Sequence, residues 1–219
     1  MRFLLNFITN TKVKSTFIIL ILLCIFIFIS ALSYTNAISS NIADSVFRLH
    51  VIANSDSAED QELKYKVRDA LLQYMDSLCS NSNSKSEIVE IAKKNEQSFY
   101  NIARKVISEN SYDYNIAIKI GNYDFPTKNY GDITLPAGNY EALRVEIGEA
   151  TGQNWWCVMF PPLCFVDIST GIVPDESKEI IKDNLSDEEY DLISKTDKPT
   201  IKFKFSLIEM LQNLKIANK

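Results

Sequence analysis

The longest apolar stretch of the chain lies near its N-terminus, where residues 17–29 are hydrophobic without interruption. The stretch extends to Leu32, the residues before it carry only positive charges, and the first carboxylate is Asp44. This arrangement is typical of a bacterial export signal or an N-terminal membrane anchor. Its length falls just short of the roughly 17 residues that a spanning helix needs. A small-x-small motif ends at Ala37, so cleavage after Ala37 and retention as an anchor over residues 15–32 both stay open.

Beyond the N-terminal segment 1–37 and a short polar connector over 38–45, the hydrophobic periodicity predicts a single extracytoplasmic domain over 46–219. Apolar and polar residues alternate in the predicted strands, and apolar residues recur every three to four positions in the predicted helices. The predicted strands cover 46–53, 112–120, 140–147, 155–160 and 201–205, and the predicted helices cover 58–78, 86–108, 175–184, 186–195 and 206–217.

These elements predict an α+β fold with an antiparallel sheet of four or five strands. The helices 58–78 and 86–108 each have one apolar face and are joined by a short polar loop, so we expect an antiparallel pair that packs on the sheet. We expect strand 155–160 to pair antiparallel with strand 140–147, because it follows that strand after a short loop. A C-terminal helix over 206–217 completes the predicted domain.

The predicted domain is acidic, which narrows the classes of partner. Residues 38–219 contain 20 Lys and Arg against 28 Asp and Glu, a formal charge of −8. Nucleic acids and anionic lipid surfaces bind clustered positive charge, so neither is an expected partner. The sequence has one His, no Cys-x-x-Cys motif and no Gly-rich phosphate-binding motif. It therefore predicts no metal, no cofactor and no small-molecule substrate.

Three cysteines lie outside the hydrophobic stretch, namely Cys79, Cys157 and Cys164. An odd number excludes a complete disulfide framework. Cys157 and Cys164 are the close pair, and an exported location would allow a disulfide between them. Two buried apolar thiols in an aromatic segment are the alternative, and both interpretations stay open.

His50 is the residue best suited to act as a base near neutral pH. It lies in the middle of a predicted strand with Arg48 on the same face and without a Gly-x-Ser-x-Gly motif, so a half-exposed strand position is favoured over catalysis. A pairing with Cys157 is disfavoured because the Trp-rich segment around that thiol would raise its pKa. Asp56 and Asp60 fit the positions of helix-capping and first-turn acids.

The segment 155–165 is too apolar for an exposed loop. Burial in the core is favoured over a partner-binding patch for most of it. Trp155 and Trp156 are adjacent, and neighbouring residues of a strand point to opposite faces. One of the two indoles is therefore available to a partner.

Three blocks of mixed polar and aromatic residues stand out. They are Phe47–Ser57 with its continuation to Asp69, Thr134–Val145, and Asn154–Asp167. These blocks resemble the stage II sporulation protein R family, exported signalling proteins of endospore-forming Firmicutes. The resemblance spans roughly residues 47–167, over half of the chain, and the tail from about residue 175 carries no such block.

The resemblance implies export from the forespore into the space between the two sporulation membranes. There the protein would activate a membrane-embedded aspartic protease of the mother-cell membrane, which cleaves the precursor of sigma factor E. In this role the chain is a ligand rather than an enzyme. The resemblance implies no particular contact residues.

Polar residues on the first strand and the following helix exceed what capping and solubility require, so we expect them to form the partner-binding surface. The candidate residues are Arg48, His50, Asn54, Asp56, Asp60, Gln61, Lys64, Arg68, Arg144, Trp155 and Trp156. One alternative is an exported hydrolase of peptide or cell-wall material that works through His50, or through Asp56 and Asp60. A purely structural envelope protein is another.

Overall fold

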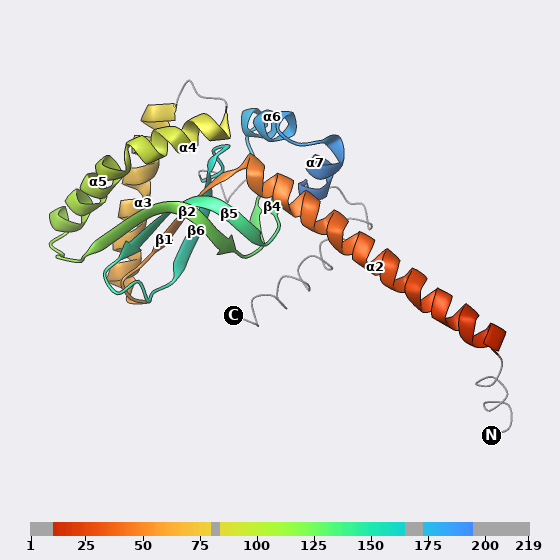
Figure 1. The fold of residues 1–219 in the computed structure, drawn as a ribbon. Helices are drawn as coiled ribbons and strands as arrows, with labels where there is room; N and C mark the ends of the chain where they lie inside the picture. The colour runs from red at the N-terminus through yellow and green to blue at the C-terminus, as the bar shows by residue number, and fades with distance from the viewer. Residues whose placement is uncertain (1–10, 80–83, 165–172, 195–219) are drawn as a thin grey trace. The chain divides into compact units, whose positions relative to one another are not determined.

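The computed structural model describes residues 11–79, 84–164 and 173–194 (Figure 1). The chain divides into two compact units, Met1–Ile38 and Ser39–Lys219. The helices are α2 (Thr11–Ser45), α3 (Ala58–Cys79), α4 (Lys85–Lys94), α5 (Glu96–Glu109), α6 (Asp175–Asp183) and α7 (Asp187–Ile193), and the strands are β1 (Phe47–Ile52), β2 (Ile116–Phe125), β3 (Lys128–Tyr130), β4 (Ile133–Leu135), β5 (Gly138–Ile147) and β6 (Asn154–Phe160).

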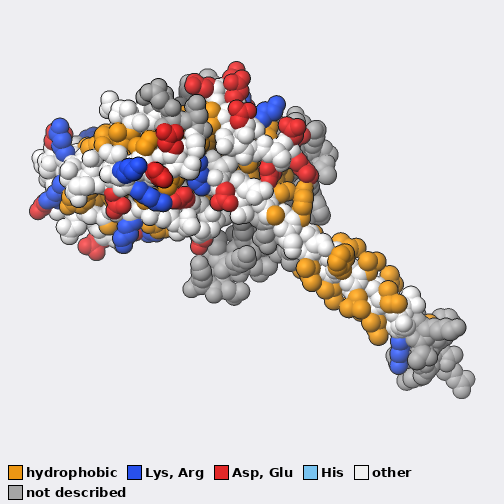
Figure 2. Space-filling view, turned by 45° about the horizontal axis from the view of Figure 1, so that its top comes forward, with side chains coloured by type: hydrophobic (Ala, Val, Ile, Leu, Met, Phe, Trp, Pro, Cys, Tyr) orange, Lys and Arg blue, Asp and Glu red, His pale blue; other side chains and the backbone are white. Residues whose placement is uncertain are grey.

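The first unit contains most of α2. The large apolar side chains between Phe17 and Ile29 are exposed, and Figure 2 shows hydrophobic side chains along this helix. Residues Val13–Ala31 are long and apolar enough to cross a membrane, judged by length and composition. An exposed apolar helix at the N-terminus is suited to a signal or anchor segment.

The last turns of α2 belong to the second unit. Residues 39–45, expected as part of a polar connector, are helical up to Ser45. Ile42 and Ala43 are buried, and Asn41 Nδ2 donates a hydrogen bond of 2.7 Å to Glu189 Oε1 of α7. The helix continues because this part of the chain gains apolar burial and a polar contact within the domain.

In the described part of the chain, the main sheet has four strands in the order β2-β5-β1-β6. The α+β class is confirmed, and the sheet is mostly antiparallel, with a parallel pair formed by β1 and β5. The prediction that residues 155–160 pair with residues 140–147 is wrong, because β1 lies between β5 and β6. The loop over 148–153 is long enough to pass the roughly 10 Å that one intervening strand occupies.

The core lies between one face of the sheet and helices α3, α4 and α5, which Figure 1 shows on one side of the sheet. Helix α3 is confirmed to within one residue of its predicted end. The predicted helix 86–108 is instead divided at Asn95 into α4 and α5. Asn95 Nδ2 donates to Ile91 O at 2.8 Å, and its Oδ1 accepts from Tyr74 Oη at 3.0 Å. Such side-chain bonds compete with the helical ladder, which explains the interruption.

The remaining differences concern strand limits. Strand β2 begins at Ile116 rather than at residue 112 and continues to Phe125, and the hairpin β3–β4 forms inside a segment expected as a loop. Helices α6 and α7 are confirmed close to their predicted positions. The strand predicted for 201–205 and the helix predicted for 206–217 lie outside the described residues.

Candidate functional site

The predicted partner-binding residues fall into three groups in the structure. The first is the junction between β1 and α3, where Asp60 is almost fully buried. Its Oδ2 accepts hydrogen bonds from Asn54 Nδ2 at 2.8 Å and from Ser55 Oγ at 2.5 Å, while its N–H donates to Ser57 Oγ at 3.1 Å. Burial alone would raise the pKa of Asp60, but hydrogen bonds from Ser55, Asn54 and Tyr114 lower it below its ordinary value.

Lys64 extends this junction towards the loop between β5 and β6. Its side chain is buried, and Nζ donates to Gln61 Oε1 at 2.5 Å and to Gln153 O at 3.0 Å. Burial lowers the pKa of Lys64, and the nearby charge of Arg68 acts in the same direction. Gln61 Nε2 in turn donates to Ser55 O at 2.9 Å.

The loop over 148–153 is held by the same junction. Asn54 Oδ1 accepts from the N–H of Glu149 at 3.0 Å, and Asp56 Oδ1 accepts from the N–H of Gln153 at 2.7 Å. A Cβ at Gly152 would lie 2.2 Å from Ser55 O, so only glycine allows this approach. Asn54, Asp56, Asp60, Gln61 and Lys64 are thus engaged within the domain, which gives their polarity a structural explanation.

The second group lies on the sheet face opposite α3 and α5. Strand register places Arg144 and Trp156 on either side of His50, in one row across the sheet. His50 is 7% exposed rather than half-exposed, its Nε2 lies 2.7 Å from Asn154 Oδ1, and its ring stacks on Trp156 with centroids 5.7 Å apart. Burial lowers the pKa of His50, so the ring is neutral near pH 7. These contacts supply no nucleophile or acid for a catalytic triad.

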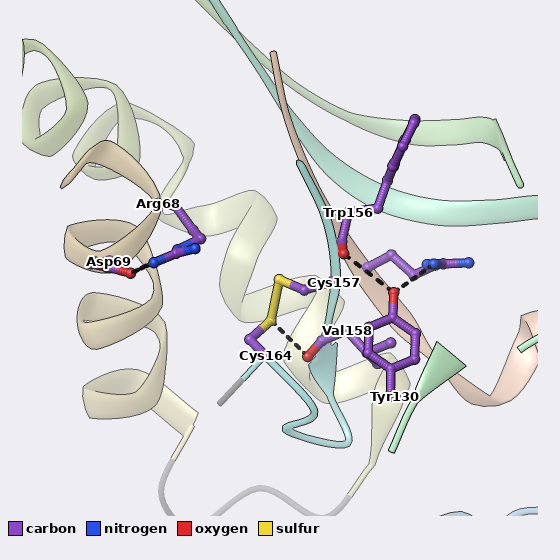
Figure 3. Close-up of a disulfide and its surroundings, with 8 residues drawn as sticks. Arg68, Asp69, Tyr130, Trp156, Cys157, Val158 and Cys164 are labelled. Atoms are coloured by element: carbon purple, nitrogen blue, oxygen red, sulfur yellow. Dashed lines mark hydrogen bonds and ion pairs between the residues drawn. A yellow bond between two sulfur atoms is a disulfide. The ribbon is translucent and has the colours of Figure 1, made fainter. Parts of the chain in front are cut away.

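Arg48 lies one row away and is fully buried. Its guanidinium carbon lies 4.1 Å from the ring centroid of Phe125 and 4.6 Å from that of Tyr140. Its Nη2 donates to Tyr130 Oη at 2.8 Å. Tyr130 Oη in turn donates to Trp156 O at 3.3 Å (Figure 3). None of the described carboxylates forms an ion pair with Arg48. Its positive charge is therefore stabilised by aromatic rings and by one hydroxyl group.

The exposed part of this face surrounds Arg144. Its Nη2 pairs with Glu146 Oε1 at 2.6 Å, and its guanidinium lies 5.1 Å from the ring centroid of Tyr123. A hollow of about 140 Å³ opens here, and its lining consists of Ala117, Lys119, Tyr123, Arg144 and Glu146. We call the positions Lys119, Tyr123, Lys128, Arg144, Glu146 and Trp156 the open sheet face.

The third group lies where α3 meets β6. Arg68 has its guanidinium 4.3 Å from the ring centroid of Trp155 and 4.9 Å from that of Tyr65, and it pairs with Asp69. Trp155 and Trp156 lie on opposite faces, because their cross-strand partners Val51 and His50 are neighbours on β1. This confirms the alternation expected for the two indoles.

Cys157 and Cys164 form a disulfide with Cα atoms 5.1 Å apart (Figure 3). The sequence left open whether these residues form a disulfide or are two buried thiols, and in the structure they form the disulfide. The N–H of Leu163 donates to Val158 O at 3.1 Å inside the ring that the bridge closes. Burial raises the pKa of the unbridged Cys79 to about 11, which makes that thiol a poor nucleophile. No group of three or more potential ligands in the described ranges is arranged to hold a metal ion.

Two comparisons identify relatives of the chain. A family model described as Stage II sporulation protein R matches residues 43–170. Stage II sporulation protein R of Bacillus subtilis (strain 168) is 33% identical over 185 residues, which cover 79% of this chain and 83% of that protein. The chain belongs to the stage II sporulation protein R family. No solved structure matches it.

Membership of the stage II sporulation protein R family assigns the chain a role in sporulation signalling. The matched residues 43–170 contain all three groups described above, whereas α6 and α7 lie beyond them. Sequence reasoning missed Lys119, Tyr123 and Lys128 of the open sheet face. Alternation along β2 places Lys119 and Tyr123 on one face, but only the register with β5 shows that this face also carries Arg144.

Proposed function

We propose that this stage II sporulation protein R family member is an extracytoplasmic ligand that activates a membrane-embedded aspartic protease. The protease then processes the precursor of sigma factor E. The signal passes from forespore to mother cell, because the protein is exported into the space between their two membranes. Activation by a ligand means that the bound protein favours the active arrangement of the protease.

The observation that carries the proposal is the family match over residues 43–170, in a chain whose helix α2 exposes apolar side chains between Phe17 and Ile29. The chemistry of the described residues fits a ligand. His50 is buried beside Asn154, and Asp56 and Asp60 are engaged in hydrogen bonds that hold two loops together. None of these groups is placed to activate a nucleophile or a water molecule.

The proposal is tested by expressing the full chain, the protease and a tagged sigma factor E precursor in a bacterium that does not sporulate. We expect the short processed form on an immunoblot only when all three are present. A variant without residues 1–38, which stays in the cytoplasm, is expected to give no processing. A protease with its catalytic aspartate replaced is the control for the source of cleavage.

Two results separate this function from an exported hydrolase. A His50→Gln variant is expected to keep full processing, because a ligand does not use the imidazole as a base. The triple variant in which Arg48, Asp60 and Arg68 become Ala tests the surface expected from the sequence, with folding checked by circular dichroism. Processing with the chain omitted, or hydrolysis of peptides by the purified chain alone, would overturn the proposed function.

A further inference from the structure

The open sheet face has a charge opposite to that of the whole chain. The chain has a formal charge of −5. Among the described residues, this face and the layer beneath it contain the cations Lys119, Lys128, Arg144 and Arg48, against the single carboxylate of Glu146. In an acidic protein, such a local excess of positive charge attracts a partner with negative charge.

Several N–H groups of this face, and of the buried Arg48 next to it, have no acceptor among the described residues. Within the described ranges, Arg48 Nε and Nη1, Arg144 Nε and Trp156 Nε1 are buried without a hydrogen-bond partner. Buried donors without acceptors, and a buried cation without an anion, cost free energy. A negatively charged group bound over this face would offset part of that cost, because the field of an anion acts strongly where water is excluded.

The exposed atoms of the face are arranged for such a group. Arg144 uses Nη2 for Glu146, which leaves further N–H groups of its guanidinium beside Lys119 at the edge of the hollow. On the other side of the row, Lys128 Nζ lies 4.4 Å from the ring centroid of Trp156. Positively charged side chains therefore lie both at the hollow and beside the ring of Trp156.

We propose that the open sheet face binds an acidic segment of the partner protein. A carboxylate of that segment lies between Arg144 and Lys119, and a neighbouring side chain of the segment packs on Trp156 beside Lys128. The inference rests on the proposed function, since the partner is the extracytoplasmic part of the activated protease. Aromatic and arginine side chains are the residue types that carry most of the affinity in protein–protein interfaces.

The chemistry of the face favours a protein over a nucleic acid or a membrane. Glu146 lines the hollow beside Arg144, and the rings of Tyr123 and Trp156 lie among the cations. Nucleic acids and anionic bilayers bind more continuous positive surfaces, and the remaining surface of this acidic domain would repel them.

The decisive variant is Lys119→Glu. The Lys119 side chain is exposed, so reversing its charge leaves the packing of the core unchanged. The matched control is Lys105→Glu on α5, where Lys105 is 72% exposed and lies on the opposite side of the sheet. Binding of each purified full-length chain to the detergent-solubilised protease is measured at low and high salt. We expect Lys119→Glu to weaken binding about tenfold at low salt and the control to stay within about twofold.

A second probe keeps this inference separate from the proposed function. Fluorescence anisotropy with a labelled hexaglutamate peptide, and with hexalysine as its counterpart, tests the acidic preference without the protease. We expect the native chain to bind hexaglutamate and not hexalysine. The Lys119→Glu variant is expected to lose the binding of hexaglutamate. If the native chain binds hexaglutamate but never triggers processing, the proposed function fails and the acidic site stands.

Three outcomes would overturn the acidic site. In the first, Lys119→Glu and Lys105→Glu weaken protease binding equally. In the second, the native chain binds and activates the protease while Lys119→Glu does so undiminished, which leaves the proposed function intact. In the third, the native chain binds neither the protease nor hexaglutamate. A Lys128→Glu variant repeats the test if Lys119→Glu fails to fold by circular dichroism.

Discussion

The two faces of the four-stranded sheet are built from the same strands but have different chemistry. Towards α3, α4 and α5, strands β1 and β5 present Leu49, Val51, Leu143 and Val145, all of which are buried. One residue along each strand, the opposite face presents Arg48, His50, Arg144 and Glu146. Because side chains alternate along a strand, one segment packs one half of its residues in the core and places the other, polar half on the opposite face.

The faces also differ in how completely their groups are satisfied. The helix-covered face is closed mainly by apolar packing, which has no direction, and among its described side chains Trp155 Nε1 is the buried N–H group without an acceptor. On the opposite face, guanidinium groups contact aromatic rings and a hydroxyl group. Several buried N–H groups of this face have no acceptor among the described residues. The comparison predicts that substitutions on the first face change stability, whereas those at exposed positions of the second change binding.

The largest effect is expected from Phe99→Ala on α5. Phe99 is fully buried in the helix-covered core and packs edge-to-face on Tyr74 with ring centroids 5.2 Å apart. Its truncation is expected to lower the free energy of unfolding by about 3–5 kcal/mol, measured by urea denaturation of the purified chain. Tyr123→Ala on the open sheet face is the matched aromatic truncation, with an expected loss of about 1 kcal/mol from its contact with Arg144. Equal losses for the two variants would contradict the difference between the faces.

A smaller effect is expected from Asp60→Ala at the junction of β1 and α3. The change removes two charge-assisted hydrogen bonds and leaves Asn54 Nδ2 and Ser55 Oγ without their acceptor. We expect a loss of about 2–3 kcal/mol at pH 7. Lys66→Ala, an exposed change on the same helix, is expected to stay within about 0.5 kcal/mol.

The same variant has a predicted pH signature. The folded-state pKa of Asp60 lies below its ordinary value of 3.8, so the folded chain releases this proton more readily than the unfolded chain. The stability contributed by the carboxylate is therefore present above pH 3.8 and is lost as the pH falls through the folded pKa. In Asp60→Ala this part of the acid dependence should disappear. An unchanged acid limb would show that Asp60 is not responsible for it.

The smallest effect concerns His50. Its pKa is lowered from 6.5 mainly by burial, with Arg144 and Arg48 in the same direction and the Asn154 hydrogen bond and Glu146 opposing. In the unfolded chain the imidazole of His50 takes up a proton near pH 6.5, whereas in the folded chain it stays neutral until a lower pH. Stability is therefore expected to decline as the pH falls below 6.5 and to level off below the folded pKa.

The measurement for His50 is the chemical shift of its imidazole during a pH titration by NMR, together with urea denaturation at pH 7 and pH 5.5. His50 is the single histidine of the chain, so its signal is unambiguous. In His50→Gln the part of the stability change attributed to the imidazole should vanish. A folded-state midpoint at or above 6.5 would contradict the assigned environment.

The sequence predicted the local elements well, because their signals are local. Helix α3 has a serine cap, acids in its first turn and apolar residues at helical spacing, and its ends agree with the prediction to within one residue. Strand pairing was harder, because β6 follows β5 in the chain and yet pairs with β1. Periodicity shows that a segment is a strand, but the competition among long-range partners decides its neighbour.

The candidate site shows the same limit. The residue types at Asn54, Asp56 and Lys64 were recognised as an excess of polar groups, but their partners in the loop over 148–153 lie about ninety positions further along the chain. A polar side chain in a sequence does not reveal whether it will meet water or a buried backbone group. Whether these residues also contact a partner stays a prediction.

The interior position of β1 has a consequence for the order in which the domain can form. β1 directly follows α2, yet Leu49 pairs with Leu143 on one side and with Cys157 on the other. A nascent chain therefore delivers this strand long before either neighbour has been synthesised. The contacts that complete the sheet are among the most distant in sequence, so they form late and slowly. Until β6 has been synthesised, β1 lacks one of its two neighbouring strands, so the sheet stays incomplete until about three quarters of the chain has been made.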